Sequence, residues 1–269
     1  MPRTMTLLSL AGFDPSGGAG LLLDLAVFRR LGFHGAGVMT ALTFQNTRRV
    51  LGVRSVARRD VEAQYRALRG DIPWSGLKVG MIGSPENLAF IARVLAENGR
   101  LPRVVDPVLR SSSGARLLER AAASRFLASL RGRASVITPN IAEAAVLSGR
   151  RIRGLDDARP AARAIFEATG VPCLIKGGHG QGPVVDLLYD GRSDKVFVHK
   201  RLTADVHGTG CYLSAALLAF LARGNDLERA CGLAIRLTVR AMQESVRPGR
   251  GRRIMDPNQQ VKKKSTLDL

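Results

Sequence analysis

A short stretch in the last third of the chain, residues 207–211 (HGTGC), combines residue types that could hold and transfer an anion. The apolar segment after it, residues 212–221, has the spacing of a helix with one buried face, so unpaired backbone N–H groups gather at its start. These groups attract anions, and the same helix end favours the thiolate form of Cys211. A glycine turn before a core helix with an inert, buried cysteine would produce the same pattern, so both interpretations stay open here.

Polar side chains also follow several apolar segments, at the positions where parallel sheets place ligands. Gln45 comes shortly after residues 36–41 and carries a donor and an acceptor, which suits the edge of an aminopyrimidine or equally a stabilised turn. Asp106 follows two valines and precedes a proline, so we expect it at the rim of a sheet, facing a metal-bound phosphate or capping a turn. Asn140 and Glu143 have the spacing of a helix capping box, which by itself would explain both.

A second glycine-rich stretch, residues 14–20 (DPSGGAG), joins an apolar segment at 5–11 to a helical pattern at 21–31. Its spacing differs from the G-x-G-x-x-G of dinucleotide-binding folds, and no acidic residue closes the next apolar segment, so that fold is not favoured. Asp24 lies among leucines in the first turns of this predicted helix. Such a carboxylate either complements the helix start or faces a pocket.

The elements required to position these residues alternate between strand and helix. Residues 184–189 and 195–199 flank Asp190-Gly191, a strong hairpin signal. The order predicts an α/β fold with a doubly wound, mostly parallel central sheet flanked by helices, and with a small antiparallel hairpin. The other expected strands are residues 5–11, 36–41, 77–81, 103–108, 135–138 and 173–179, and the main expected helices are residues 21–31, 59–68, 85–98 and 212–221.

The composition favours one domain with a basic surface. With 45% hydrophobic content in 269 residues, the chain can bury one large core, and we expect residues 1–246 to form a single domain. The net charge of +19 attracts polyanions such as ATP and nucleic acid, but most of the arginines are spread singly, as on a solvated surface. Residues 247–269 concentrate basic side chains in a segment with little apolar content, which predicts a mobile tail and the one segment suited to nucleic acid.

Location and redox state are predicted from patterns that the sequence lacks. No apolar run is long enough to span a bilayer, and residues 1–10 lack the pattern of a cleavable signal, so we expect a cytoplasmic protein with no membrane partner. Cys173, Cys211 and Cys231 are scattered without a C-x-x-C pair. This spacing fits a reducing compartment and the absence of a structural zinc site.

Several motifs carry a resemblance to a known family. They are residues 11–20 (AGFDPSGGAG), 45–47 (QNT), 106–108 (DPV), 138–140 (TPN) with Glu143, 176–179 (KGGH) and 207–211 (HGTGC). Together they closely resemble the hydroxymethylpyrimidine and phosphomethylpyrimidine kinases of thiamine biosynthesis, which belong to the ribokinase-like superfamily. The motifs keep the order of that family, and the match extends from about residue 5 to about residue 242, although no single motif would have sufficed.

The resemblance implies a kinase that uses ATP and Mg²⁺ to phosphorylate 4-amino-5-hydroxymethyl-2-methylpyrimidine and then its monophosphate, and that assembles as a homodimer. It assigns the anion hole for the transferred phosphoryl group to Gly208, Thr209 and Gly210, and places Cys211 where most ribokinase-like enzymes keep an aspartate base. The pyrimidine would be held by Asp24 and Gln45 at its polar edge and by Ala19, Met81 and Val108 along its faces. The ATP phosphates would be surrounded by Asp106, Asn140, Glu143 and Lys176, of which Asp106 and Glu143 would hold Mg²⁺ mainly through water.

Departures from the family pattern keep two alternatives open. Leu22 and Leu23 stand where relatives usually have Gln-Ala, and Ser112 and Ala115 replace a common lysine and an expected acid. The segment from Arg247 onward replaces a glycine-histidine-glycine-proline motif. A pyridoxine or pyridoxal kinase would share the Gly-Thr-Gly-Cys turn, and a non-catalytic pyrimidine-binding regulator would tolerate these losses. The complete turn and the retained phosphate-binding residues favour the pyrimidine kinase.

Overall fold

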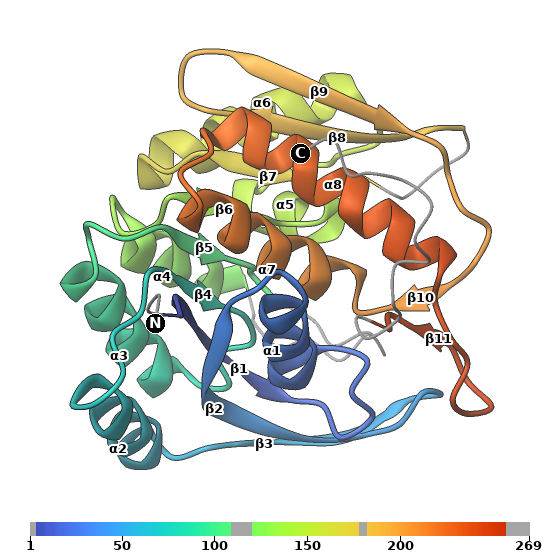
Figure 1. Ribbon diagram of the computed structural model, residues 1–269. Coiled ribbons are helices and arrows are strands. Elements are labelled where there is room, and N and C mark those ends of the chain that lie inside the picture. The colour runs from blue at the N-terminus through green and yellow to red at the C-terminus, as the bar shows by residue number, and fades with distance from the viewer. Residues whose placement is uncertain (1–3, 109–119, 178–181, 257–269) are drawn as a thin grey trace.

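The computed structural model describes residues 4–108, 120–177 and 182–256. Its central sheet has nine strands: β1 (Thr6–Phe13), β2 (His34–Gln45), β3 (Val50–Ser55), β4 (Leu77–Val79), β5 (Arg103–Val105), β6 (Val136–Ile137), β7 (Cys173–Ile175), β8 (Val184–Tyr189) and β9 (Asp194–His199). They are ordered β3-β2-β1-β4-β5-β6-β7-β8-β9 across the sheet (Figure 1). The six strands from β2 to β7 in this order are parallel, whereas β3 pairs antiparallel with β2, and β8 with both β7 and β9.

Helices cover both faces of this sheet (Figure 1). One face carries α1 (Gly20–Arg30), α7 (Thr209–Ala222) and α8 (Leu227–Gln243), and the other carries α2 (Arg58–Arg69), α3 (Pro85–Glu97), α4 (Arg120–Leu130), α5 (Ile141–Ser148) and α6 (Leu155–Thr169). Because successive strand side chains point to opposite faces, Leu7 and Val104 pack with the first group of helices and Leu8 and Val105 with the second. The sheet is therefore buried on both sides, as in doubly wound folds.

The predicted doubly wound, mostly parallel fold is confirmed, including the hairpin of β8 and β9. β2, however, continues to Gln45 instead of ending near residue 41, and β3 pairs with it as an edge strand. A separate pair of two-residue strands, β10 (Val206–His207) and β11 (Arg253–Ile254), runs parallel. β3 is half exposed and β10 and β11 are very short, so neither an alternating nor a continuous apolar pattern marks them.

The folded domain extends past the boundary predicted at residue 246. β11 pairs with β10, and the backbone N–H of Arg252 donates to the carbonyl oxygen of Thr47 at 2.8 Å. Met255 is 1% exposed and residues 251–254 are partly buried, so this part of the predicted tail packs on the domain, whereas residues 247–250 are exposed. The basic composition of this segment gave no indication that it packs on the domain, because β10 and Thr47, with which it pairs, lie far away in the chain. Residues 257–269 lie outside the described part, as do Ser112 and Ala115.

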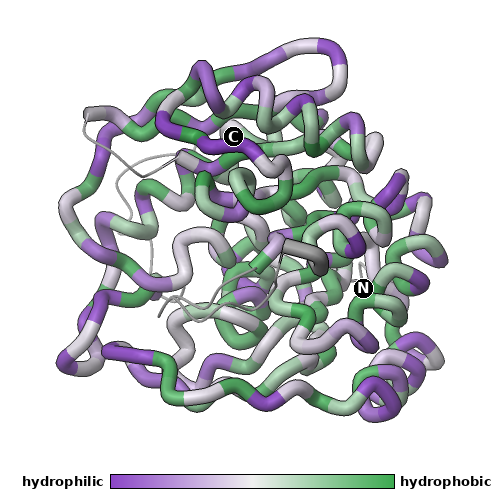
Figure 2. Tube along the Cα trace, turned by 180° about the vertical axis from the view of Figure 1, so that it is seen from behind, coloured by the Kyte–Doolittle hydropathy of each residue, from purple (hydrophilic) through white to green (hydrophobic). Residues whose placement is uncertain are grey.

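Hydropathy follows the layers of the fold (Figure 2). α2 is largely hydrophilic, and only its Val61 and Tyr65 are buried. α7 is apolar almost all round, and its residues 212–220 are buried against the sheet and the neighbouring helices. Within the ranges that the structure describes, no helix combines the length and the apolar character needed to cross a membrane.

Candidate active site

A cavity of about 850 Å³ lies at the carboxyl ends of the parallel strands and includes the start of α7. Such strand ends are the usual ligand sites of open α/β sheets. The cavity gathers every residue that the sequence predicted for the site except Asp24. Those that line it are Ala19, Gln45, Met81, Asp106, Val108, Asn140, Glu143, Lys176, Gly208, Thr209, Gly210 and Cys211.

The turn before α7 has the form of an anion site. Gly208 is the N-cap of α7 with a φ of +86°, and no side chain in the described part of the molecule caps the N–H groups that follow. A β-carbon at this position would overlap the carbonyl oxygen of Gly18 and would lie 2.8 Å from Leu23 Cδ2, so only glycine fits. The start of α7 therefore presents uncapped N–H groups in the cavity wall, where anions bind.

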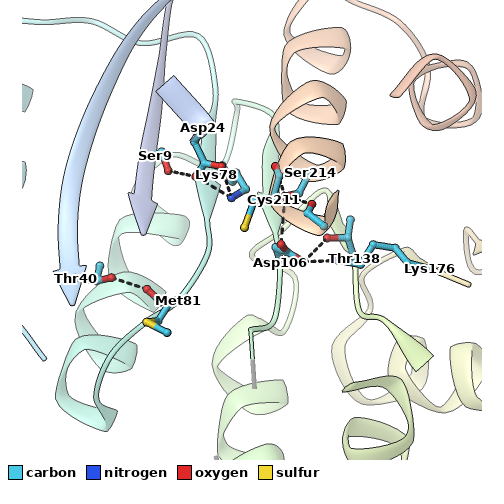
Figure 3. A network of polar contacts seen from close by, with 11 residues as sticks. Ser9, Asp24, Thr40, Lys78, Met81, Asp106, Thr138, Lys176, Cys211 and Ser214 are labelled. Atoms are coloured by element: carbon cyan, nitrogen blue, oxygen red, sulfur yellow. Dashed lines mark hydrogen bonds and ion pairs between the residues drawn. The ribbon is translucent and has the colours of Figure 1, made fainter. Parts of the chain in front are cut away.

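Cys211 lies in the cavity wall with its sulfur beside Lys78 (Figure 3). Burial is the largest influence on this thiol and raises its pKa to about 11, although the charge of Lys78 acts to lower it. From the sequence, the helix start was predicted to favour the thiolate. The structure corrects this prediction, because the removal of the thiol from water outweighs the effect of the helix end. Cys211 is therefore a protonated thiol at neutral pH.

Asp106 and Lys176, at the ends of β5 and β7, form an ion pair in the cavity wall. Lys176 Nζ lies 2.6 Å from Asp106 Oδ1, and the hydroxyl of Thr138 donates to the same oxygen at 3.2 Å. Ser214 of α7 donates to the other oxygen at 3.3 Å (Figure 3). Burial acts to raise the pKa of Asp106, but Lys176 and Lys78 outweigh it and hold that pKa below its usual value. The site thus keeps an ionised carboxylate beside an ammonium group.

Asn140 and Glu143 form the capping box that their spacing predicted. Asn140 Oδ1 accepts from the backbone N–H of Glu143 at 2.9 Å, and Glu143 Oε2 accepts from the backbone N–H of Asn140 at 2.8 Å. Both residues also line the cavity, so the start of α5 contributes to the same space as the start of α7. The structural role of this pair is confirmed, while its contact with ATP phosphates stays a prediction.

The carboxylates of the cavity suit Mg²⁺ better than they suit a metal ion whose ligands all come from the protein. Among the described residues, no group of three or more His, Cys, Asp and Glu side chains is placed to hold a metal ion. Mg²⁺ is commonly held by one or two carboxylates together with water and substrate phosphates. Asp106 and Glu143, which both line the cavity, fit that pattern.

Lys78 lines the cavity but is not among the site residues predicted from the sequence. Its side chain, on β4, is fully buried, and its Nζ lies 2.8 Å from each carboxylate oxygen of Asp24. The hydroxyl of Ser9 donates to Asp24 at 2.7 Å (Figure 3). Burial acts to lower the pKa of Lys78, but the charge of Asp24, the charge of Asp106 and the hydrogen bond to Asp24 raise it above its ordinary value. Lys78 is therefore a charged ammonium group in the cavity wall.

Asp24 lies behind Lys78 and does not line the cavity. Its side chain is 0% exposed, and Lys78 and Ser9 engage both of its oxygens. The predicted direct contact with the edge of a pyrimidine does not fit this position. The sequence did contain an indication of the ion pair between Lys78 and Asp24. A lysine in an apolar strand and an acid in an apolar helix are each expected to be buried, and each then needs a partner of opposite charge.

Comparison with known proteins shows which families share these features. The sequence model of the phosphomethylpyrimidine kinase family matches residues 14–256. The hydroxymethylpyrimidine/phosphomethylpyrimidine kinase of Aquifex aeolicus is 37% identical over 254 residues, which cover 94% of this chain and 100% of the relative. The thiamine biosynthesis bifunctional protein ThiED of Geobacter sulfurreducens is 40% identical over 248 residues, 91% of this chain and 51% of that protein. The solved structure of pyridoxal kinase from Staphylococcus aureus in complex with AMP-PCP and pyridoxal has a TM-score of 0.85 and 28% identity, covering 95% of this chain and 94% of that one.

Proposed function

The chain belongs to the phosphomethylpyrimidine kinase family, and we propose that it transfers a phosphoryl group from ATP to 4-amino-5-hydroxymethyl-2-methylpyrimidine and then to the resulting monophosphate. The product is the pyrimidine diphosphate used in thiamine biosynthesis. The observation that carries this proposal is that one cavity brings together Gln45, the Asp106–Lys176 pair and the turn at residues 208–211.

The acceptor occupies the part of the cavity next to Gln45. The amide of Gln45 binds the polar edge of the ring, and Ala19, Met81 and Val108 contact its faces. The backbone N–H groups of residues 208–210 stabilise the negative charge that develops on the transferred phosphoryl group. These roles use the uncapped start of α7, where bound anions gain both hydrogen bonds and the favourable end of the helix dipole.

The nucleotide occupies the part of the cavity lined by Asn140, Glu143 and Lys176. Lys176 offsets the charge of the phosphates, and the start of α5 adds backbone N–H groups. Asp106 and Glu143 would hold Mg²⁺, mainly through water, and the bound ion would supply positive charge that neutralises the charge developing on the phosphates. The S. aureus pyridoxal kinase structure, which contains the ATP analogue AMP-PCP, supports the use of ATP.

The direct test offers the purified protein the pyrimidine alcohol, its monophosphate and pyridoxal in turn, with ATP and Mg²⁺, and measures ADP. We expect ADP from both pyrimidines, with the pyrimidine diphosphate as the final product. A preference for pyridoxal would replace this proposal with a pyridoxal kinase, the second candidate, which the likeness to the S. aureus structure supports. Tight pyrimidine binding without ADP from any acceptor would indicate a non-catalytic regulator.

Replacing Asn140 with alanine is expected to have two separable effects. Loss of the cap lowers the free energy of unfolding by about 1 kcal/mol, measured by urea denaturation. Loss of an amide beside the phosphates raises the KM for ATP roughly threefold to tenfold. The control is Ser84→Ala, because Ser84 caps α3 by accepting from the backbone N–H of Asn87 at 3.2 Å and does not line the cavity. An equal rise in the KM for ATP in both variants would contradict a nucleotide contact at Asn140.

The assembly and location also belong to this proposal. We propose a cytoplasmic homodimer that has no membrane partner and needs no nucleic acid. Phe44 and Leu51, on the adjacent strands β2 and β3 at the sheet edge, are 47% and 64% exposed. Exposed apolar side chains on an edge strand and its neighbour support a contact with another protein, here a second copy of the chain.

A further inference from the structure

Asp186 is a buried carboxylate outside the cavity that none of the roles above uses. It lies on β8, is 3% exposed and does not line the cavity. Its Oδ1 accepts from the backbone N–H of Gly177 at 2.6 Å, and its Oδ2 lies 3.2 Å from Nε2 of His199 on β9. Both oxygens are therefore engaged, one by the residue that follows Lys176 and one by the neighbouring strand of the hairpin.

His199 holds the carboxylate of Asp186 from the second side. The hydrogen bond with Asp186 raises the pKa of His199 above its ordinary value, although burial acts to lower it. The protonated form of His199, which donates from Nε2, is thus favoured beside this carboxylate. The position of Asp186 is therefore set by β9 as well as by its contact with Gly177.

The hydrogen bond to Asp186 fixes the peptide unit that joins Lys176 to Gly177. A β-carbon at Gly177 would overlap the carbonyl oxygen of Val185, so only glycine lets the chain approach β8 this closely. On the other side of Lys176, its own backbone N–H donates to the carbonyl oxygen of Pro139 at 2.8 Å. The backbone of Lys176 is thus held on both sides of its Cα atom.

The ammonium group of Lys176 lies beside the anion-binding turn. Its Nζ lies 2.6 Å from Asp106 Oδ1 (Figure 3), and a β-carbon at Gly210 would lie only 3.0 Å from the same Nζ. A lysine side chain is a flexible four-carbon stem that can carry its charge to many places. A fixed backbone at Lys176 therefore limits where this charge lies relative to the turn.

We propose that Asp186 is a positioning residue for nucleotide binding: by accepting from Gly177, it holds the ammonium group of Lys176 beside the turn at residues 208–211, where the phosphates of ATP bind. The inference rests on the proposed function, because it requires Lys176 to contact those phosphates. Asp186 acts through Lys176 and touches neither ATP nor the acceptor. Its loss therefore weakens nucleotide binding and leaves the acceptor part of the cavity, next to Gln45, unchanged.

Asp186→Ala tests this inference, because it leaves the backbone N–H of Gly177 without its acceptor. The readout is the Kd of the ATP analogue AMP-PCP in the presence of Mg²⁺, measured by isothermal titration calorimetry. We expect this Kd to rise about 10-fold, as for the loss of a hydrogen bond to a charged group. The KM for the pyrimidine alcohol at saturating ATP is expected to stay within about twofold of its original value.

Asp186→Asn separates positioning from a general effect on stability. Its amide oxygen still accepts from Gly177, so the Kd of AMP-PCP is expected to stay within about threefold of the original value. Both variants lose the negative charge beside His199, so both are expected to unfold at a lower temperature than the unaltered protein. A role in stability alone would instead change the Kd in both variants or in neither.

Asp190→Ala is the matched control from the same hairpin. Asp190 accepts from the backbone N–H groups of Arg192 and Ser193, at 2.8 and 2.7 Å, and does not line the cavity. Its loss is expected to leave the Kd of AMP-PCP unchanged. In a Lys176→Met background, Asp186→Ala is expected to cause no further rise in this Kd, because its effect passes through Lys176.

An unchanged Kd in folded Asp186→Ala overturns the inference, and so does an equal rise in Asp186→Asn or a further rise in the Lys176→Met background. Circular dichroism and thermal unfolding establish which variants are folded. Asp186→Val takes the place of Asp186→Ala if the latter does not fold, since valine also lacks an acceptor and favours a strand, and the same rise is expected.

Failure of the proposed function looks different. The unaltered protein then binds AMP-PCP but phosphorylates neither pyrimidine, and the Kd values of the variants still decide whether Asp186 positions Lys176. Absence of AMP-PCP binding in the unaltered protein overturns both statements.

Discussion

Replacing Lys78 with methionine is expected to lower the free energy of unfolding by about 3–5 kcal/mol, because it leaves the carboxylate of Asp24 buried without a counter-charge. Both side chains are fully buried and lie 2.8 Å apart. Water therefore does not replace the ammonium group of Lys78 beside the carboxylate of Asp24. Methionine has nearly the length of lysine, and the change therefore removes the charge more than the packing. Urea denaturation followed by circular dichroism measures the loss.

The matched control for Lys78→Met removes both charges at once. In the double variant Asp24→Leu/Lys78→Met, most of the stability is expected to return, since apolar side chains in place of a buried ion pair are often neutral or stabilising. Ser9 loses its acceptor in that variant, so full recovery is expected only with Ser9→Ala in addition. Equal losses in the single and double variants would show that Lys78 contributes packing and not charge.

A second large effect is expected from Cys211→Ala, and it falls on one of the two proposed reactions. The pyrimidine alcohol must lose its proton during attack, and only the minor thiolate form of Cys211 can accept that proton. A general base contributes about 10²–10⁴-fold to such a step, so kcat/KM for the alcohol, measured near pH 9 where more of the thiolate is present, is expected to fall by about 100-fold. The monophosphate has a second pKa of about 6 and attacks as an anion, so its reaction is expected to fall by less than about tenfold. Steady-state kinetics with each acceptor measure the difference.

The pH dependence gives a second check on Cys211. Because burial raises the pKa of Cys211 to about 11, the thiolate fraction increases with pH throughout the neutral range. With Cys211 as the base, kcat/KM for the alcohol rises between about pH 7 and 9. The monophosphate reaction stays level there, above its own pKa of about 6.

Cys231→Ala controls for the loss of a buried sulfur, because Cys231 is buried in α8 and does not line the cavity. This variant is expected to leave unchanged the ratio of kcat/KM for the alcohol to kcat/KM for the monophosphate. An equal loss in both reactions after Cys211→Ala, or a level pH profile for the alcohol, would exclude Cys211 as the base.

The order of the elements could be read from the sequence because each signal depends on residues that are close together in the chain. Apolar segments bounded by glycine and proline indicated the parallel strands, and Asp190-Gly191 indicated the hairpin. The capping box of Asn140 and Glu143 spans a single helical turn, so its spacing was sufficient. The family resemblance then joined distant motifs into one site, and the cavity contains nearly all of the residues it named.

Only the tertiary structure decided which charged groups meet and which protonation states they keep. Lys78 and Asp24 are 54 positions apart, and His207 and Asp14 are 193 positions apart, so no local pattern links them. The pKa of Cys211 depends on how completely the surrounding chain excludes water, and that exclusion outweighs the helix start that the sequence revealed. A sequence shows that a buried charge needs a partner, whereas the packing of the sheet and its helices selects the partner.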